Sequence, residues 1–305
     1  MKRICTPTLL ARVSDVTSFK KLALLLAMIA AIGLGTTTGH AQNERSWVSN
    51  TGTNNTFCTV ADPCQTFAQA IAVTPTGGEI NCLTPGGFGP VTISESVTIN
   101  CQHASNGGIT GATAITINTA GIVVNLIGLD LDGGNTGGGN GISITAPAAV
   151  TIRNCKIYDF LDNGGYTGFG ILIMPTASGA ILIADNIYVA NNGYGIGILN
   201  NIGSANITLR NSNINNNAYG ILLQMNSGTH AGATIEKTTI AFNSDYGLAI
   251  LGSGAVALIG GSTVVNNATG VLVEHGAIAY SFDNNQIGGN GTDGTPLTAY
   301  PGGLR

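Results

Sequence analysis

Ionisable side chains recur at one position of a repeated segment in this chain. Val150–Ile157 and Ile207–Ile214 are nearly the same octapeptide, and three further segments fit the same frame. One column of that frame contains Arg153, Asp185, Arg210, Glu236 and Asp283, with Gly260 as an interruption. If these segments are stacked strands, neighbouring side chains lie about 4.8 Å apart, and their charges mostly alternate in sign.

This charge column supports two interpretations. As a cleft, it would bind a charged sugar, with Arg210 as a base or a clamp. As a structural feature, it would be a ladder of opposite-charge pairs between strands, each worth roughly 0.2–1 kcal/mol. We favour the ladder and keep the cleft as the alternative.

Two carboxylates, Asp130 and Asp132, alternate on a strand-like segment that ends in Gly133 and Gly134. Alternate strand residues point the same way, so the two carboxylates would converge and offer oxygen ligands to Ca²⁺. The spacing matches no complete calcium loop, and paired glycines are also typical of a strand end. Apart from this candidate for Ca²⁺, we expect no cofactor.

Three tyrosines, Tyr194, Tyr219 and Tyr246, each directly precede a glycine of a repeat, and Phe169 has the same place one repeat earlier. The spacing predicts four rings stacked in a line. Stacked rings at a turn usually serve packing, whereas an exposed line of rings would bind a glycan by ring stacking. We expect packing and keep glycan binding as the alternative.

The elements that position these side chains follow from a glycine repeat. A glycine followed by mostly apolar residues recurs at Gly141, Gly170, Gly195, Gly220, Gly247 and Gly270, at intervals of 23 to 29 residues. The first and third residues after each glycine are always large and aliphatic. This period of two predicts short strands with one buried face. The second residue is also mostly apolar, and this apolar strip would underlie a loop or meet another chain.

Asparagine forms two further columns. One contains Asn154, Asn186, Asn211 and Asn284, and the other contains Asn191, Asn216, Asn243 and Asn266. Asparagine tolerates the left-handed backbone region better than other non-glycine residues, which suits a sharp turn repeated in every coil. Stacked amides can also hydrogen-bond from one coil to the next.

Coils of this length are too short for a βαβ unit and lack helical periodicity. Parallel stacking of such coils predicts an all-β fold, a single-stranded right-handed parallel β-helix, with roughly eight to ten coils. The frame of Ile-x-Asn, then Asn, then Gly-Ile-x-Ile resembles the repeat of the pectate-lyase-like superfamily. The segment from Trp47 to Ile99 resembles the entry region of secreted β-helix proteins, and this resemblance implies a short N-terminal capping helix at about Thr66 to Val73.

The N-terminus predicts export. A basic segment precedes the apolar stretch Leu22–Leu34, and small residues precede a cut after Ala41, as in a signal peptide. We therefore expect residues 1–41 to be removed, 42–77 to form a cap, 78–294 the β-helix and 295–305 a tail, with the product secreted or periplasmic and without a membrane anchor. That product has six basic and 14 acidic residues, a net charge of −8, which argues against nucleic acid as a partner.

Cysteine usage fits an oxidising compartment. Cys58 and Cys64 bracket a short loop and predict a local disulfide. Cys82 and Cys101 end two consecutive strand-like segments and would either stack or bridge. Cys155 is the odd one, for which we expect a buried thiol.

The resemblance is specific for the fold and weak for activity. Galacturonan hydrolases of the superfamily carry Asn-Thr-Asp, Asp-Asp, Gly-His-Gly and Arg-Ile-Lys motifs, and none of these four is present. We therefore expect a non-enzymatic module that binds a polysaccharide or a surface protein. The alternative is a polysaccharide lyase or glycoside hydrolase. Self-association through a solenoid end or through the apolar strip is a third possibility.

Overall fold

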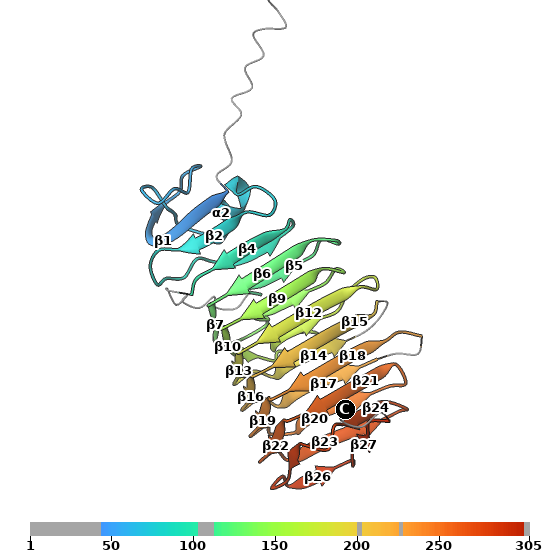
Figure 1. Ribbon diagram of the computed structural model, residues 1–305. Coiled ribbons are helices and arrows are strands. Elements are labelled where there is room, and N and C mark those ends of the chain that lie inside the picture. The colour runs from blue at the N-terminus through green and yellow to red at the C-terminus, as the bar shows by residue number, and fades with distance from the viewer. Residues whose placement is uncertain (1–43, 103–112, 200–202, 226–227, 302–305) are drawn as a thin grey trace, which may run out of the picture. The chain divides into compact units, whose positions relative to one another are not determined.

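A computed structural model describes residues 44–102, 113–199, 203–225 and 228–301 of the chain. The predicted signal peptide, its cut after Ala41 and the last four residues of the predicted tail lie outside these ranges. The described residues form three parallel sheets and one helix, α2 (Phe67–Val73). Successive coils lie one upon another (Figure 1).

Each full coil contributes one strand to each sheet, and neighbouring strands in a sheet come from successive coils. The eleven-stranded sheet contains β1 (Arg45–Thr53), β2 (Glu79–Cys82), β4 (Val97–Asn100), β6 (Val123–Ile127), β9 (Ala149–Arg153), β12 (Ala180–Asp185), β15 (Ala205–Arg210), β18 (Ala231–Glu236), β21 (Ala255–Gly260), β24 (Ile278–Ser281) and β27 (Thr298–Ala299). The seven-stranded sheet contains β7 (Asp130–Gly137), β10 (Lys156–Leu161), β13 (Tyr188–Ala190), β16 (Asn213–Asn215), β19 (Thr239–Ala241), β22 (Thr263–Val265) and β25 (Gln286–Ile287). The nine-stranded sheet contains β3 (Val91–Ile93), β5 (Ile115–Ile117), β8 (Ile142–Ile144), β11 (Phe169–Ile173), β14 (Tyr194–Leu199), β17 (Tyr219–Gln224), β20 (Tyr246–Leu251), β23 (Thr269–Glu274) and β26 (Thr292–Gly294).

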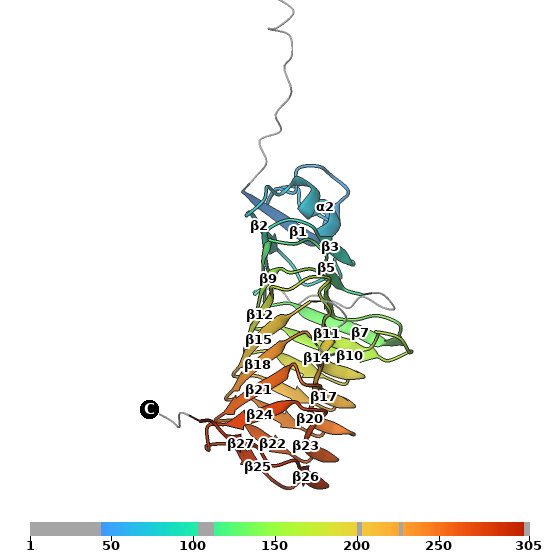
Figure 2. The ribbon, with the colours of Figure 1, turned by 90° about the vertical axis from the view of Figure 1, so that its right-hand side faces the viewer.

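The parallel β-helix expected from the repeat is therefore confirmed, with one refinement. The octapeptide Val150–Ile157 is not one strand, because it is divided between β9 and β10 in different sheets. Asn154 lies at this division with a φ of 55°, the left-handed conformation that asparagine tolerates. In Figure 2 the two long strands β7 and β10 extend sideways beyond the shorter strands of their sheet.

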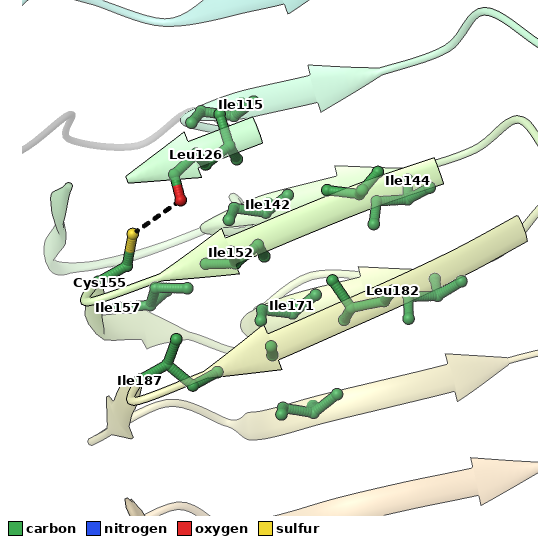
Figure 3. Close-up of a cluster of buried hydrophobic side chains, with 14 of the residues drawn as sticks. Ile115, Leu126, Ile142, Ile144, Ile152, Cys155, Ile157, Ile171, Leu182 and Ile187 are labelled. Atoms are coloured by element: carbon green, nitrogen blue, oxygen red, sulfur yellow. Dashed lines mark hydrogen bonds between the residues drawn. The ribbon is translucent and has the colours of Figure 1, made fainter. Parts of the chain in front are cut away.

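The interior is filled by aliphatic side chains stacked in columns. Ile142, Ile171 and Ile196 occupy one register position of the nine-stranded sheet, so the alignment by glycine is correct. All three are at most 1% exposed. Figure 3 shows how such side chains from opposite sheets meet inside the coils.

The repeat glycines are required by the close approach of successive coils. A Cβ at Gly195 would contact the carbonyl oxygen of Gly220 and the side chain of Ile214. A Cβ at Gly220 would lie 2.5 Å from the carbonyl oxygen of Gly247. Since real Cβ atoms do not approach backbone so closely, any side chain here would push the coils apart.

The second asparagine column predicted from sequence is partly wrong, because the structure divides it into two. Asn191, Asn216 and Asn266 are left-handed turn residues, and Phe242 has that place in the coil of Asn243. The buried ladder lies one residue later and consists of Asn192, Asn217, Asn243, Asn267 and Asn290. The amide nitrogens of the first four donate to the Oδ1 of the next asparagine at 2.8–3.2 Å, and that of Asn290 donates to Asp293 at 3.0 Å.

Two disulfides lie near the N-terminal end of the described chain. Cys58–Cys64 is bonded as predicted, and Cys82 and Cys101 bridge rather than merely stack. Cys155 is the buried free thiol expected, and burial raises its pKa to about 12. Its Sγ takes the place of the hydroxyl that Ser212 and Ser262 supply in later coils, since all three bond to the carbonyl two residues before them.

Helix α2 begins with a capping box. Thr66 accepts a hydrogen bond from the backbone of Gln69, and the Gln69 side chain accepts one from the backbone of Thr66. The helix contacts β1, β2 and β3. Strand β1, within the segment predicted as a cap, pairs in parallel with β2 and so begins the eleven-stranded sheet.

Candidate functional site

The rings predicted to stack form a line on the outer face of the nine-stranded sheet, where Phe169–Tyr194 and Tyr194–Tyr219 are stacked and Tyr219–Tyr246 is tilted. Strands β11, β14, β17 and β20 place Phe169, Tyr194, Tyr219 and Tyr246 at one register position. Ring centroids of successive residues lie 4.3, 5.1 and 5.2 Å apart, with interplanar angles of 12°, 27° and 37°. We call these four residues the aromatic row.

The aromatic row packs against the apolar strip noticed in the sequence. Leu172, Leu222 and Ala249 are 2%, 5% and 0% exposed, although they belong to a cluster separate from the inner core. Tyr219 and its neighbouring rings pack on this cluster. The chain's own rings thus cover part of the strip, and self-association through it stays a prediction.

The stacking determines which part of each ring a ligand could contact. Since the rings face one another along the row, a ligand would meet ring edges and hydroxyl groups rather than open ring faces. The tyrosines of the row are half-buried, and among the described residues none of their hydroxyls has a hydrogen-bond partner. Three accessible donors therefore lie in a line, one for each coil.

Two exposed carboxylates flank the row. Burial, followed by the charges of Asp162 and Asp245, raises the pKa of Tyr194. Burial and Asp245 also raise the pKa of Tyr219. The hydroxyls of Tyr194 and Tyr219 therefore stay protonated at neutral pH as donors, and the carboxylates beside them offer acceptor oxygens.

The charge column lies on a different sheet. Asp185 pairs in register with Arg153 on one side and with Arg210 on the other, and Arg210 pairs with Glu236. No ion pair within 4.0 Å joins these four side chains in the described parts of the chain. Asp185 accepts instead from the amide of Asn211 at 2.7 Å. The arrangement is a surface column on the eleven-stranded sheet, whereas the aromatic row lies on the nine-stranded sheet.

Asp283 does not belong to this column, so that part of the alignment is wrong. Ile259 pairs with Ser281, which places Phe282 rather than Asp283 beside Gly260. The cause is one additional residue in the turn between β24 and β25. The same shift removes Asn284 from the left-handed column, where Asp283 has a φ of 61°.

Asp130 and Asp132 lie on β7 next to Lys156 and Tyr158 of β10. The ammonium of Lys156 is 3.9 Å from Oδ2 of Asp130, whose other oxygen is buried and has no hydrogen-bond partner among the described residues. Asp132 accepts from the backbone of Gly134 at 2.7 Å. Burial, followed by the neighbouring carboxylate of Asp130, raises the pKa of Tyr158.

These residues fit a calcium ion poorly. Ca²⁺ takes six to eight oxygen ligands, but one carboxylate here already faces an ammonium. Within the residues that the structure describes, no group of three or more His, Cys, Asp or Glu side chains converges as metal ligands would. Calcium binding at Asp130 and Asp132 remains a prediction.

The chain matches the family described as "Right handed beta helix region" over residues 48–287. It belongs to that family. The solved structure of pectate lyase Pel9A resembles this β-helix protein with a TM-score of 0.53 and 14% sequence identity, over 80% of this chain and 76% of that one. At that identity the likeness concerns the fold alone. No curated protein matches the chain.

Among the described residues of this β-helix protein, no helix is both long and apolar enough to cross a membrane. Sequence reasoning missed three residues of these surfaces: Asp162 and Asp245 beside the aromatic row, and Phe282 beside Gly260. Asp245 directly precedes Tyr246, so the repeat contained a usable signal. Asp162 lies in the longer loop after β10, where the repeat gives no register, and Phe282 was displaced by the additional turn residue.

Proposed function

We propose that this β-helix protein is a non-enzymatic polysaccharide-binding module and that the aromatic row is its binding surface. One observation carries the proposal: three stacked tyrosines present unpaired hydroxyls at intervals of 5.1 and 5.2 Å between ring centroids. A solenoid repeats the same groups along its length, and such surfaces suit extended ligands.

The spacing favours a polymer over a small molecule. The interval between tyrosines is close to the length that one pyranose residue adds to an extended 1→4-linked glycan. Each sugar residue would then meet the hydroxyl edge of one ring, while Asp162 and Asp245 accept hydrogen bonds from sugar hydroxyls. Each contact would be weak, and the binding energy would come from repeating the same contact at each tyrosine of the row. Such contacts need no enclosed cavity.

We propose export as the setting for this activity, and two disulfides support it, since such bonds persist in oxidising compartments. We also infer that helix α2 covers the N-terminal end of the coils and so protects strand edges. Its contacts with β1, β2 and β3 support that role.

A polysaccharide array tests the proposal. We expect saturable binding to at least one 1→4-linked polymer, equal with and without a calcium chelator, and no shortening of the bound polymer after prolonged incubation. Binding only to proteins, or no binding to any polymer, would contradict it.

The second candidate is a polysaccharide lyase, and one observation favours it: Lys156, Tyr158 and the two carboxylates gather on neighbouring strands. An unprotonated lysine amine can act as a general base, and carboxylates beside it can position a substrate. If a uronate polymer yields unsaturated product, detected by ultraviolet absorbance, and Lys156→Met abolishes the reaction while Lys237→Met does not, the lyase replaces the binding module.

A further inference from the structure

A hollow of about 350 Å³ lies beside the C-terminal end of the charge column. It is lined by Glu236, Lys237, Gly260, Gly261, Phe282 and Asn284. These residues come from three successive coils, at the ends of β18, β21 and β24. The hollow therefore belongs to the turn between the eleven-stranded and seven-stranded sheets, away from the aromatic row.

The hollow exists because two consecutive glycines replace larger side chains. Glu236 pairs in register with Gly260, and Lys237 precedes Gly261 by one coil. Phe282 of the next coil forms a wall, since a Cβ at Gly260 would lie 2.9 Å from its Cδ2. Tyr300 packs on the Phe282 ring with centroids 5.2 Å apart, which holds this wall in place.

The polar groups around the hollow are a carboxylate, an ammonium and an amide. The Oδ1 of Asn284 accepts from the backbone N–H of Gly261 at 2.7 Å, which fixes the amide and leaves its NH₂ group free to donate. Glu236 and Lys237 are exposed and make no ion pair in the described chain. The three groups surround an aromatic wall and a floor without side chains.

We propose that this hollow binds a single neutral pyranose residue. A pyranose has a face of C–H groups, which packs on an aromatic ring, and a rim of hydroxyls, which needs donors and acceptors. Phe282 supplies the ring, Glu236 the acceptor, and Lys237 and Asn284 the donors. The charges of Glu236 and Lys237 cancel, and Asp283 adds a negative charge at the same turn, so a uronate is disfavoured.

This second site does not depend on the aromatic row. The row would hold several residues of a polymer, whereas the hollow accommodates one ring. A chain end or a single side-branch residue would therefore suit it.

Saturation-transfer NMR tests the proposal, with the methyl glycosides of glucose, galactose, mannose and N-acetylglucosamine, and with galacturonate. We expect saturation transfer to at least one neutral glycoside and weaker transfer to galacturonate. Phe282→Leu and Gly260→Ala should each weaken binding by about fivefold to tenfold, the first by removing the ring and the second by filling the hollow.

Gly288→Ala is the matched control, because a Cβ there meets nothing within 4 Å. This variant should bind the glycoside normally. Should Phe282→Leu fail to fold, Glu236→Gln at an exposed position serves instead, with the same expected loss. Absence of transfer to every neutral glycoside, preference for galacturonate, or binding that ignores Gly260→Ala would overturn the proposal.

Discussion

On the outer face of the nine-stranded sheet, successive coils place the same kind of side chain at the same position. Phe169, Tyr194, Tyr219 and Tyr246 therefore stack and cover an apolar cluster. On the eleven-stranded sheet the charge column alternates between Arg153, Asp185, Arg210 and Glu236, and all of these side chains except that of Asp185 are exposed. The backbone register is equally regular on both faces.

The difference shows that the β-helix fixes the spacing between side chains of successive coils, whereas the type of side chain determines what each surface can do. Rings repeated at one strand spacing gain packing energy and still present a line of hydroxyls. Charges of alternating sign at the same spacing gain little, because water screens them. Where the column reaches Gly260 and Gly261, the loss of side chains creates the hollow described above.

The largest effect is expected at the turn that leads into the aromatic row. Asn217 precedes Tyr219 by two residues, and its Oδ1 accepts from both the backbone and the side chain of Asn192. Asn217→Ala leaves these buried donors unpaired and should lower the free energy of unfolding by about 3 kcal/mol, as measured by urea denaturation. The control is Asn216→Gly, at a left-handed position with a φ of 53°, which should change stability little. Equal losses in both variants would contradict the assignment of the buried ladder to Asn217.

Removing a ring from the middle of the row should have the next largest effect. Tyr219 contacts two neighbouring rings and covers the apolar cluster. Tyr219→Ala should cost about 2 kcal/mol of stability and at least tenfold in polysaccharide affinity, read by urea denaturation and by titration calorimetry. If Tyr219→Ala loses stability but keeps its polysaccharide affinity, the aromatic row serves packing and not binding.

High pH should lower the stability that the tyrosines of the aromatic row contribute to the folded state. The folded-state pKa values of Tyr194 and Tyr219 are raised above the ordinary 10.0, so the folded state favours the protonated hydroxyls. This stability is fully present below about pH 10 and is lost as pH rises through the raised values. Urea denaturation at pH 9 and 11 should show a smaller decline for the double variant Tyr194→Phe/Tyr219→Phe. An equal decline would show that these tyrosines do not titrate as inferred.

The smallest effect is expected on the charged face. Arg210 is exposed and makes no ion pair within the described chain. Arg210→Ala should change the free energy of unfolding by less than about 1 kcal/mol and leave polysaccharide binding intact. A loss of binding as large as that of Tyr219→Ala would move the ligand to the charged face.

The sequence predicts the fold well because the repeat glycines and the inward-facing isoleucines occupy fixed positions in each coil. Gly195 has no space for a side chain, and Ile196 must face inward, so both mark register without ambiguity. Asparagine pairs such as Asn216 and Asn217 are ambiguous, since either member fits a turn. Single asparagines that follow another residue type, as in Phe242-Asn243 and Gly289-Asn290, distinguish the exposed column from the buried one.

The candidate sites were less predictable because they depend on register at irregular coils. Because of a single additional turn residue, Phe282 lies beside Gly260 where the repeat predicts Asp283. An aromatic ring therefore stands where a charge was expected. Whether the tyrosine faces were open or stacked also required the ring geometry, since spacing along the chain is the same in both cases.

The most direct test of the account compares the protein with a variant in which Tyr194, Tyr219 and Tyr246 are all changed to Phe. This variant keeps the stacked rings and removes only the three hydroxyls, so stability at neutral pH should change little. Titration calorimetry with a polysaccharide that the protein binds should show affinity reduced at least tenfold, about 1.4 kcal/mol or more. Unchanged affinity in a stable variant would contradict the claim that the hydroxyl row is the binding surface.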